Sequence, residues 1–247
     1  MNSTEELIVV FVCLALGGIL KGATGAGAPM LVVPALTMMF DVQFAVVVML
    51  VPNLITNLWQ AWRFRKERLP GSFTWPFSAA GVLGVVTGTL ILANLPPMIL
   101  SLIVASSVFV YIFFRLIRPD WVISFGLAQK LSFPAGLTAG MLQGASGLSM
   151  PISVSFLNAM RLDRAYFIST VSVFFVCITA LQIPTLEAIG FLTLDRLLIS
   201  MAALLPILAF MPLGARIAQR LSKEVFDRIV LVLLGCLAVK LVIDALL

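Results

Sequence analysis

Lys21-Gly22-Ala23-Thr24-Gly25-Ala26-Gly27-Ala28-Pro29 is a run of small residues that interrupts an apolar segment near the start of the chain. The run recurs 122 positions later as Gln143-Gly144-Ala145-Ser146-Gly147-Leu148-Ser149-Met150-Pro151. Between positions 18 and 29, six of twelve residues are identical to their partners at this spacing. Chance identities are common in a sequence with so many apolar residues. Identities of several glycines and a proline at one constant spacing are not expected by chance.

The same spacing pairs polar residues outside the run. Asp41 is matched by Asp163, and Gln60 by Gln182, without a gap. We infer a duplication of one unit, with a first half at residues 1–119 and a second at 120–247 in a single membrane domain.

The composition indicates a membrane protein. Of 247 residues, 61% are hydrophobic and 11% charged, with a mean hydropathy of +1.13, whereas soluble domains carry about a quarter charged residues. We therefore predict an all-α polytopic membrane protein whose excess apolar surface is covered by the lipid bilayer. The net charge is +5. The basic residues lie in short loops between apolar segments, which indicates the orientation of the protein in the membrane and not a nucleic-acid partner.

The apolar segments predict about eight to ten membrane segments. The pieces on either side of each run, 7–20 and 29–40 in the first half, are expected to be too short to cross the bilayer alone. Residues 41–62 are expected to form one fuller helix that contains Pro52. Each half then has five pieces, an odd number, which predicts inverted halves. Re-entrant hairpins or kinked single helices are the alternative, with seven to nine full crossings.

Lysine and arginine predict the orientation. If residues 63–68 are cytoplasmic, 13 of the 16 basic residues lie inside, since only Lys21, Arg196 and Lys240 remain elsewhere. Both chain ends are then outside. We expect a multi-pass protein of the plasma membrane, the inner membrane of a bacterium.

The two glycine-rich runs are the predicted substrate site. Irregular backbone is costly in lipid and persists where it is buried in protein or lines a cavity. Two such breaks in inverted halves would meet near the midplane, and their free N–H groups would favour an anion. The candidates are Lys21, Gly22, Thr24, Gly25, Gly27, Gln143, Gly144, Ser146, Gly147 and Ser149. The alternative is that the glycines only form close helix-packing surfaces.

A second polar set follows each run. Side chains that share one helix face are expected to line the cavity: Asn53, Asn57 and Gln60 in the first half, and Ser172, Thr179 and Gln182 in the second. Hydrogen bonding between helices is the alternative. Asp41 and Asp163 begin segments, so we expect them to be helix N-caps, not proton carriers.

The runs GATGAGAP and GASGLSMP, each near the start of a half, resemble those of the sulfite exporter TauE/SafE family, also called the 4-toluene sulfonate uptake permeases. The resemblance covers nearly the whole chain. It departs at Leu148-Ser149-Met150, where a glycine-rich run is usual, and at Lys21. The resemblance implies a permease for small sulfur oxyanions or organosulfonates, sometimes other organic anions.

These observations favour a secondary carrier that works by alternating access. A carboxylate transporter or a passive anion channel is the alternative. Gly144-Ala145-Ser146-Gly147 also has the form seen in intramembrane serine proteases, but the chain contains no histidine to activate Ser146. We expect no enzyme activity, cofactor or metal. A small anion and lipid are the expected partners, and a homodimer is left open.

Overall fold

The computed structural model describes residues 3–117, 121–220 and 223–246, and this part of the chain is helical without strands. The helices are α1 (Ser3–Thr24), α2 (Ala28–Met39), α3 (Val42–Val48), α4 (Leu50–Arg63), α5 (Gly71–Asn94), α6 (Pro97–Ile117), α7 (Phe125–Ser146), α8 (Met150–Ala159), α9 (Arg164–Ala188), α10 (Leu194–Arg220) and α11 (Lys223–Leu246). Arg118 and Pro119, at the predicted boundary between the halves, lie outside the described residues.

Seven stretches of the described chain are long and apolar enough to cross a membrane: α1, α3 with α4, α5, α6, α9, α10 and α11. Two further apolar helices, α2 and α8, are shorter. Large apolar side chains such as Leu7, Leu205 and Val232 are exposed, which suits contact with lipid tails. The protein is therefore a multi-pass membrane protein.

The helices before the two runs are longer than the sequence predicted. α1 and α7 each contain 22 residues, which at about 1.5 Å per residue gives roughly 33 Å, not the 20 Å expected. The helix continues through the first glycines of each run because these pack against neighbouring helices, and tertiary contacts override glycine's weak helix propensity.

Residues 41–62 do not form the single helix that was expected. They divide at Met49 into α3 and α4. Pro52 explains the division, because it lacks an N–H for the carbonyl of Val48 four residues earlier and its ring crowds that carbonyl. Asp41 caps α3 as predicted: its Oδ1 accepts a hydrogen bond from Phe44 N. Asp163 also occupies the N-cap position, of α9, but its side chain makes no capping bond.

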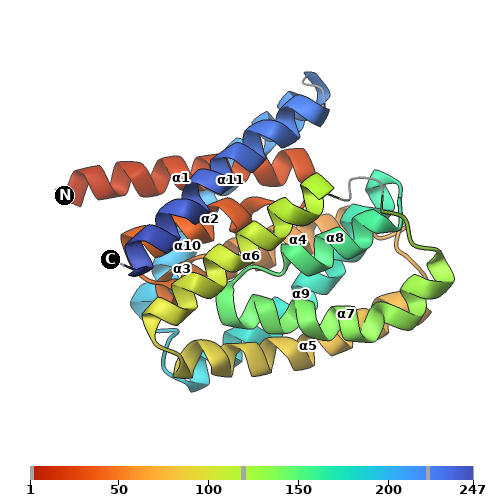
Figure 1. Ribbon diagram of the computed structural model, residues 1–247, viewed down its shortest axis with the longest axis horizontal. Coiled ribbons are helices and arrows are strands. Elements are labelled where there is room, and N and C mark those ends of the chain that lie inside the picture. Colours follow the sequence, from red (N-terminus) through yellow and green to blue (C-terminus); the bar gives the residue numbers. More distant parts are fainter. Residues whose placement is uncertain (1–2, 118–120, 221–222, 247) are drawn as a thin grey trace.

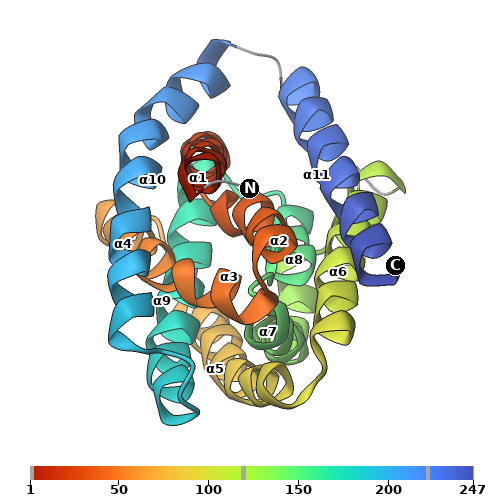
Figure 2. The same ribbon diagram turned by 90° about the vertical axis from the view of Figure 1, so that its left-hand side faces the viewer.

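Helices from residues 1–119 pack against helices from residues 120–247. α1 packs on α10, α7 packs on α5, α4 packs on α9, and α6 packs on α11. Figure 1 shows the start of α1 and the end of α11 at the same side, opposite the connections after α4 and after α8. Figure 2 shows α1 and α2 lying between α10 and α11. Most residues of the short helices α2, α3 and α8 are buried.

Candidate functional site

Each glycine-rich run contains the end of one helix and the start of the next. α1 ends at Thr24 and α7 at Ser146, and Gly25 and Gly147 follow with φ of +85° and +72°. These left-handed values suit glycine and end a helix. Gly25 N donates to Lys21 O and Gly147 N to Gln143 O, both at 2.8 Å. The two turns are therefore closed by the same hydrogen bond at equivalent positions.

Gly22 and Gly144 lie in the helices and contact neighbouring helices. A Cβ on Gly22 would lie 1.9 Å from Met211 O in α10, and a Cβ on Gly144 would lie 2.4 Å from Val85 O in α5. Gly22 and Gly144 therefore form helix-packing surfaces. This is the alternative that was given for the glycines of the two runs. Gly27 is also crowded, since its Cβ would meet Leu20 Cγ at 2.4 Å.

The hydroxyls of the two runs are engaged by the protein. Thr24 Oγ1 donates to Leu20 O at 2.9 Å and Ser146 Oγ to Leu142 O at 2.8 Å. Ser149 Oγ lies 3.1 Å from Ser153 Oγ. A ligand at the predicted site would have to compete with the protein for the hydroxyls of Thr24, Ser146 and Ser149.

Lys21 is the buried basic residue of the first run. Only 1% of its surface is exposed, and its Nζ donates to Asn57 Oδ1 at 2.7 Å and lies 5.9 Å from the centroid of the Phe175 ring. Among the described residues, no carboxylate lies within ion-pair distance of this amino group. The charged form of a buried amine is costly when its partner is a neutral amide, so a bound anion would stabilise the charged form of Lys21.

The predicted polar sets of α4 and α9 meet. Asn57 Nδ2 donates to both Asn53 O and Asn53 Oδ1 at 2.7 Å. Asn53 Nδ2 donates across to Thr179 Oγ1 at 3.0 Å, and Ser172 Oγ donates to Gln60 Oε1 at 3.3 Å. All five side chains are buried. The side chains that were predicted to line the cavity thus make hydrogen bonds between α4 and α9. Such bonds between helices were the alternative interpretation of this polar set.

The polar chain continues from α9 to the second run. Gln182 Nε2 donates to Gln143 O at 3.5 Å, and Gln143 Oε1 accepts from Ser149 N at 3.2 Å. Gln182 Oε1 is buried without a hydrogen-bond partner. Thr179 and Gln182 are three residues apart, so they lie on one face of α9. Buried polar groups therefore extend from the first run to the second.

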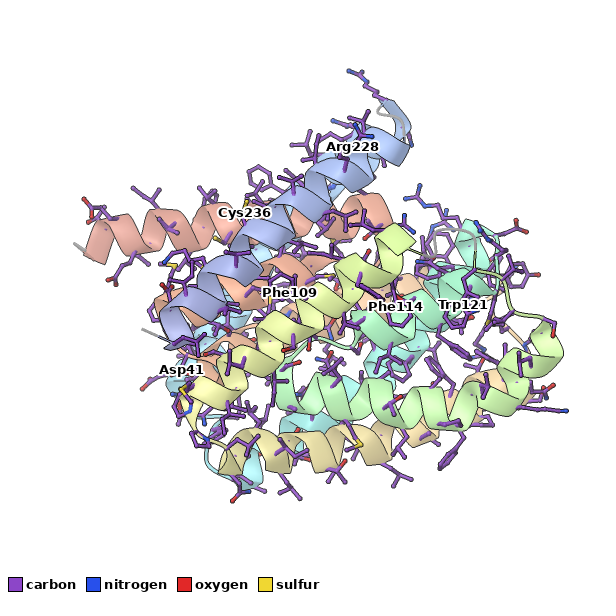
Figure 3. All side chains as sticks on the ribbon, in the orientation of Figure 1. Asp41, Phe109, Phe114, Trp121, Arg228 and Cys236 are labelled. Atoms are coloured by element: carbon purple, nitrogen blue, oxygen red, sulfur yellow. The ribbon has the colours of Figure 1, made fainter. Side chains whose placement is uncertain are left out.

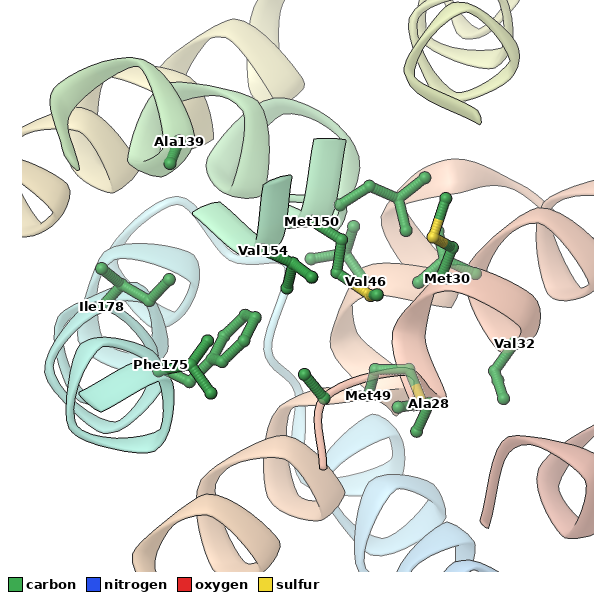
Figure 4. Packing of buried hydrophobic residues seen from close by; sticks show 14 of the residues in the cluster. Ala28, Met30, Val32, Val46, Met49, Ala139, Met150, Val154, Phe175 and Ile178 are labelled. Atoms are coloured by element: carbon green, nitrogen blue, oxygen red, sulfur yellow. The ribbon is translucent and has the colours of Figure 1, made fainter. Parts of the chain in front are cut away.

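A small void lies between the runs. Its volume is about 10 Å³, and its lining includes Pro29, Asn53, Gln143, Gly147 and Gln182. Such a space holds about one water molecule, so the site is closed to an oxyanion in this conformation. Figure 4 shows the apolar packing nearby, with Met30, Val46, Met150 and Val154 gathered together. These residues and Phe175 were not singled out from the sequence, where they are indistinguishable from other apolar residues.

The chain resembles a known family over most of its length. The family described as "Sulfite exporter TauE/SafE" matches residues 10–241, which include both glycine-rich runs and every candidate site residue. Comparisons with curated proteins and with solved structures gave no match. On the family match, the chain belongs to the sulfite exporter TauE/SafE family, which is a family of membrane transporters and not of enzymes.

Proposed function

We propose that this protein is a secondary carrier for a small sulfur-containing oxyanion, such as sulfite or an organosulfonate, and works by alternating access. The observation that carries the proposal is the buried Lys21 amino group, whose hydrogen-bond partner is the neutral amide of Asn57. A bound oxyanion would compensate the positive charge of protonated Lys21 and would accept hydrogen bonds from the surrounding side-chain amides.

We propose that the two halves, 1–119 and 120–247, are inverted repeats around this site. Two equivalent contacts support the symmetry. A Cβ on Gly25 would meet Ile168 of α9 at 2.8 Å, and a Cβ on Gly147 would meet Val46 of α3 at 3.1 Å. Both pairs are related by the spacing of 122 residues. The views support the inversion too, since α1 and α7 run in opposite directions in Figure 1.

The substrate would bind between the two breaks. Lys21 Nζ, Asn57 Nδ2 and Asn53 Nδ2 are donors at one end, and Gln182 and Gln143 lie at the other. A sulfonate or sulfite has three oxygens, which match several convergent donors. Because the void holds about one water, the halves must separate locally to admit the substrate, as alternating access requires.

Transport into proteoliposomes tests the function. We expect saturable uptake of radiolabelled sulfite or methanesulfonate, with counterflow when unlabelled substrate is inside. Lys21→Gln should lose uptake, because it removes the charge without a large change in size. Lys66→Gln, which replaces an exposed lysine, should keep it.

Other outcomes point elsewhere. Saturable uptake of carboxylates in place of sulfur oxyanions would identify a carrier of another substrate class. Conductance far above carrier turnover, without counterflow, would identify a passive anion channel. Undiminished transport by Lys21→Gln would overturn the site.

A further inference from the structure

The side chain of Gln182 in α9 presents a hydrogen-bond acceptor that the described residues leave unused. Gln182 is fully buried, and its Oε1 has no hydrogen-bond partner among these residues. The orientation of the amide follows from the other end, because Nε2 donates to Gln143 O at 3.5 Å and a carbonyl oxygen can only accept. Oε1 is therefore the atom without a partner, and a buried acceptor in this state is rare and costly.

Gln182 lines the small void between the two runs, whose volume is about 10 Å³. A larger cavity of about 520 Å³, whose lining includes Arg115, Arg161 and Arg164, is not lined by Gln182. The small void holds about one water molecule, which would donate to Oε1 while the site is closed. A ligand that enters between the runs displaces this water, and the hydrogen bond is kept only if the ligand carries a donor of its own.

A metal cation is a poorer partner for this oxygen than a donor group. Hard cations are held by several oxygen ligands at once. However, Asn53 Oδ1 already accepts a hydrogen bond from Asn57 Nδ2 at 2.7 Å, and Gln143 Oε1 accepts one from Ser149 N at 3.2 Å. Lys21 Nζ donates to the same Asn57, so protonated Lys21 would repel a cation in this polar set. A monoanion would neutralise this charge instead.

We propose that Gln182 selects a sulfur oxyanion that carries one negative charge and a hydroxyl group, such as hydrogensulfite or a hydroxyalkanesulfonate. This selection rests on the proposed function, in which Lys21 and the side-chain amides hold the anion between the two runs. The hydroxyl donates to Gln182 Oε1, while the charged oxygens accept hydrogen bonds. An anion of the same size and charge without a donor leaves Oε1 unsatisfied, so it binds more weakly.

Two anions that differ in a single group test this selection. Isethionate, a hydroxyethanesulfonate, carries a hydroxyl group where propanesulfonate carries its terminal methyl group, and both are monoanions. Their affinities are measured by isothermal titration calorimetry with the full chain in detergent. We expect isethionate to bind about ten-fold more tightly, because propanesulfonate leaves one buried acceptor unsatisfied. A site that is merely apolar would have the opposite preference, since the methyl group buries more apolar surface.

Gln182→Met removes the acceptor with little change in the size of the side chain. Gln143 O keeps the hydrogen bond from Gly147 N at 2.8 Å, so the substitution leaves this carbonyl paired and the variant should fold. We expect the preference for isethionate to disappear while the affinity for propanesulfonate is retained. A residue that only supports helix packing would lower both affinities together, so the ratio of the two affinities separates selection from support.

The matched control is Gln43→Met. Gln43 Nε2 also donates to a backbone carbonyl, Leu92 O at 3.4 Å, but Gln43 does not line the void. It lies shortly after Asp41, which Figure 3 shows at the edge of the molecule. This variant should keep the preference for isethionate. Lys21→Gln should weaken the binding of both anions, because the charge that it removes serves both of them equally.

Three results would overturn the selection by Gln182. Equal affinity of the unaltered protein for both anions, or a preference for isethionate that Gln182→Met retains, would do so and leave the carrier function standing. Anion binding that requires sodium in place of choline, with a ratio unchanged in Gln182→Met, would assign Oε1 to a cation. If neither anion binds to the unaltered protein, the proposed function fails together with the selection.

Discussion

Ser200 Oγ donates a hydrogen bond to Val48 O at 2.9 Å, and this contact joins α10 to the break between α3 and α4. Ser200 Oγ also accepts a hydrogen bond from Val51 N at 3.0 Å. Pro52 leaves the Val48 carbonyl without its usual partner four residues on. The Ser200 hydroxyl therefore satisfies one carbonyl and one N–H inside the membrane, where unpaired backbone groups are costly.

Ser200→Ala should destabilise the protein. The substitution leaves two buried backbone groups without a partner, which costs about 1–3 kcal/mol for each unsatisfied group. Thermal unfolding in detergent should show a clear decrease of the midpoint. Ser106→Ala removes a hydroxyl from the exposed face of α6 and should leave the midpoint unchanged. An equal effect of both substitutions would contradict the role of Ser200.

Gly25→Ala should strain the first turn. A left-handed φ costs about 1–2 kcal/mol for a residue with a Cβ, and this Cβ would also lie 2.8 Å from Ile168 Cγ1. We expect lower thermal stability and slower transport. Gly126→Ala is the matched control, because a Cβ there meets nothing within 4 Å. A stable and active Gly25→Ala protein would show that the turn is not required.

Lys21→Met should separate stability from binding. Replacing a buried charge by an apolar side chain is often neutral or stabilising, so the ligand-free variant should unfold at the same or a higher temperature. A ligand at 100 times its Kd stabilises by about 2.7 kcal/mol, and the variant should lose this increase with sulfite or sulfonates. Thermal shift measurements with and without the anions check both parts. A normal anion-dependent shift in Lys21→Met would exclude Lys21 from the site.

Asn57→Leu should be destabilising in the presence of Lys21 and milder in its absence. The substitution removes the hydrogen bond from Lys21 Nζ and leaves this buried amino group without that hydrogen-bond partner. Hydrogen bonds to charged groups contribute about 1.5–3 kcal/mol. A double-mutant cycle with Lys21→Met measures the coupling from unfolding free energies. Additive effects would mean that the two side chains do not depend on each other.

The sequence was informative where the residue type bears on the backbone conformation. Glycine permits positive φ, and the matched Gly25 and Gly147 have positive φ where both helices end. Polar residues spaced at helical period, such as Asn53, Asn57 and Thr179, were predicted to line a cavity. They form one buried hydrogen-bonded set, and their role in a substrate cavity stays a prediction. The expected lengths of the flanking helices were wrong, because contacts of Gly22 and Gly144 with distant helices preserve the helix through the first part of each run.

The amino-acid sequence alone determined the membrane class, the repeated pattern, the glycine turns and the cap at Asp41, because each depends on composition or on a local backbone requirement. Only the tertiary structure decided that Lys21 meets Asn57, that the Ser200 hydroxyl bonds the break before Pro52, and that Arg115, Arg161 and Arg164 line one cavity. These contacts join residues far apart in the chain. Their distances follow from how the helices pack, which no local pattern of residues specifies.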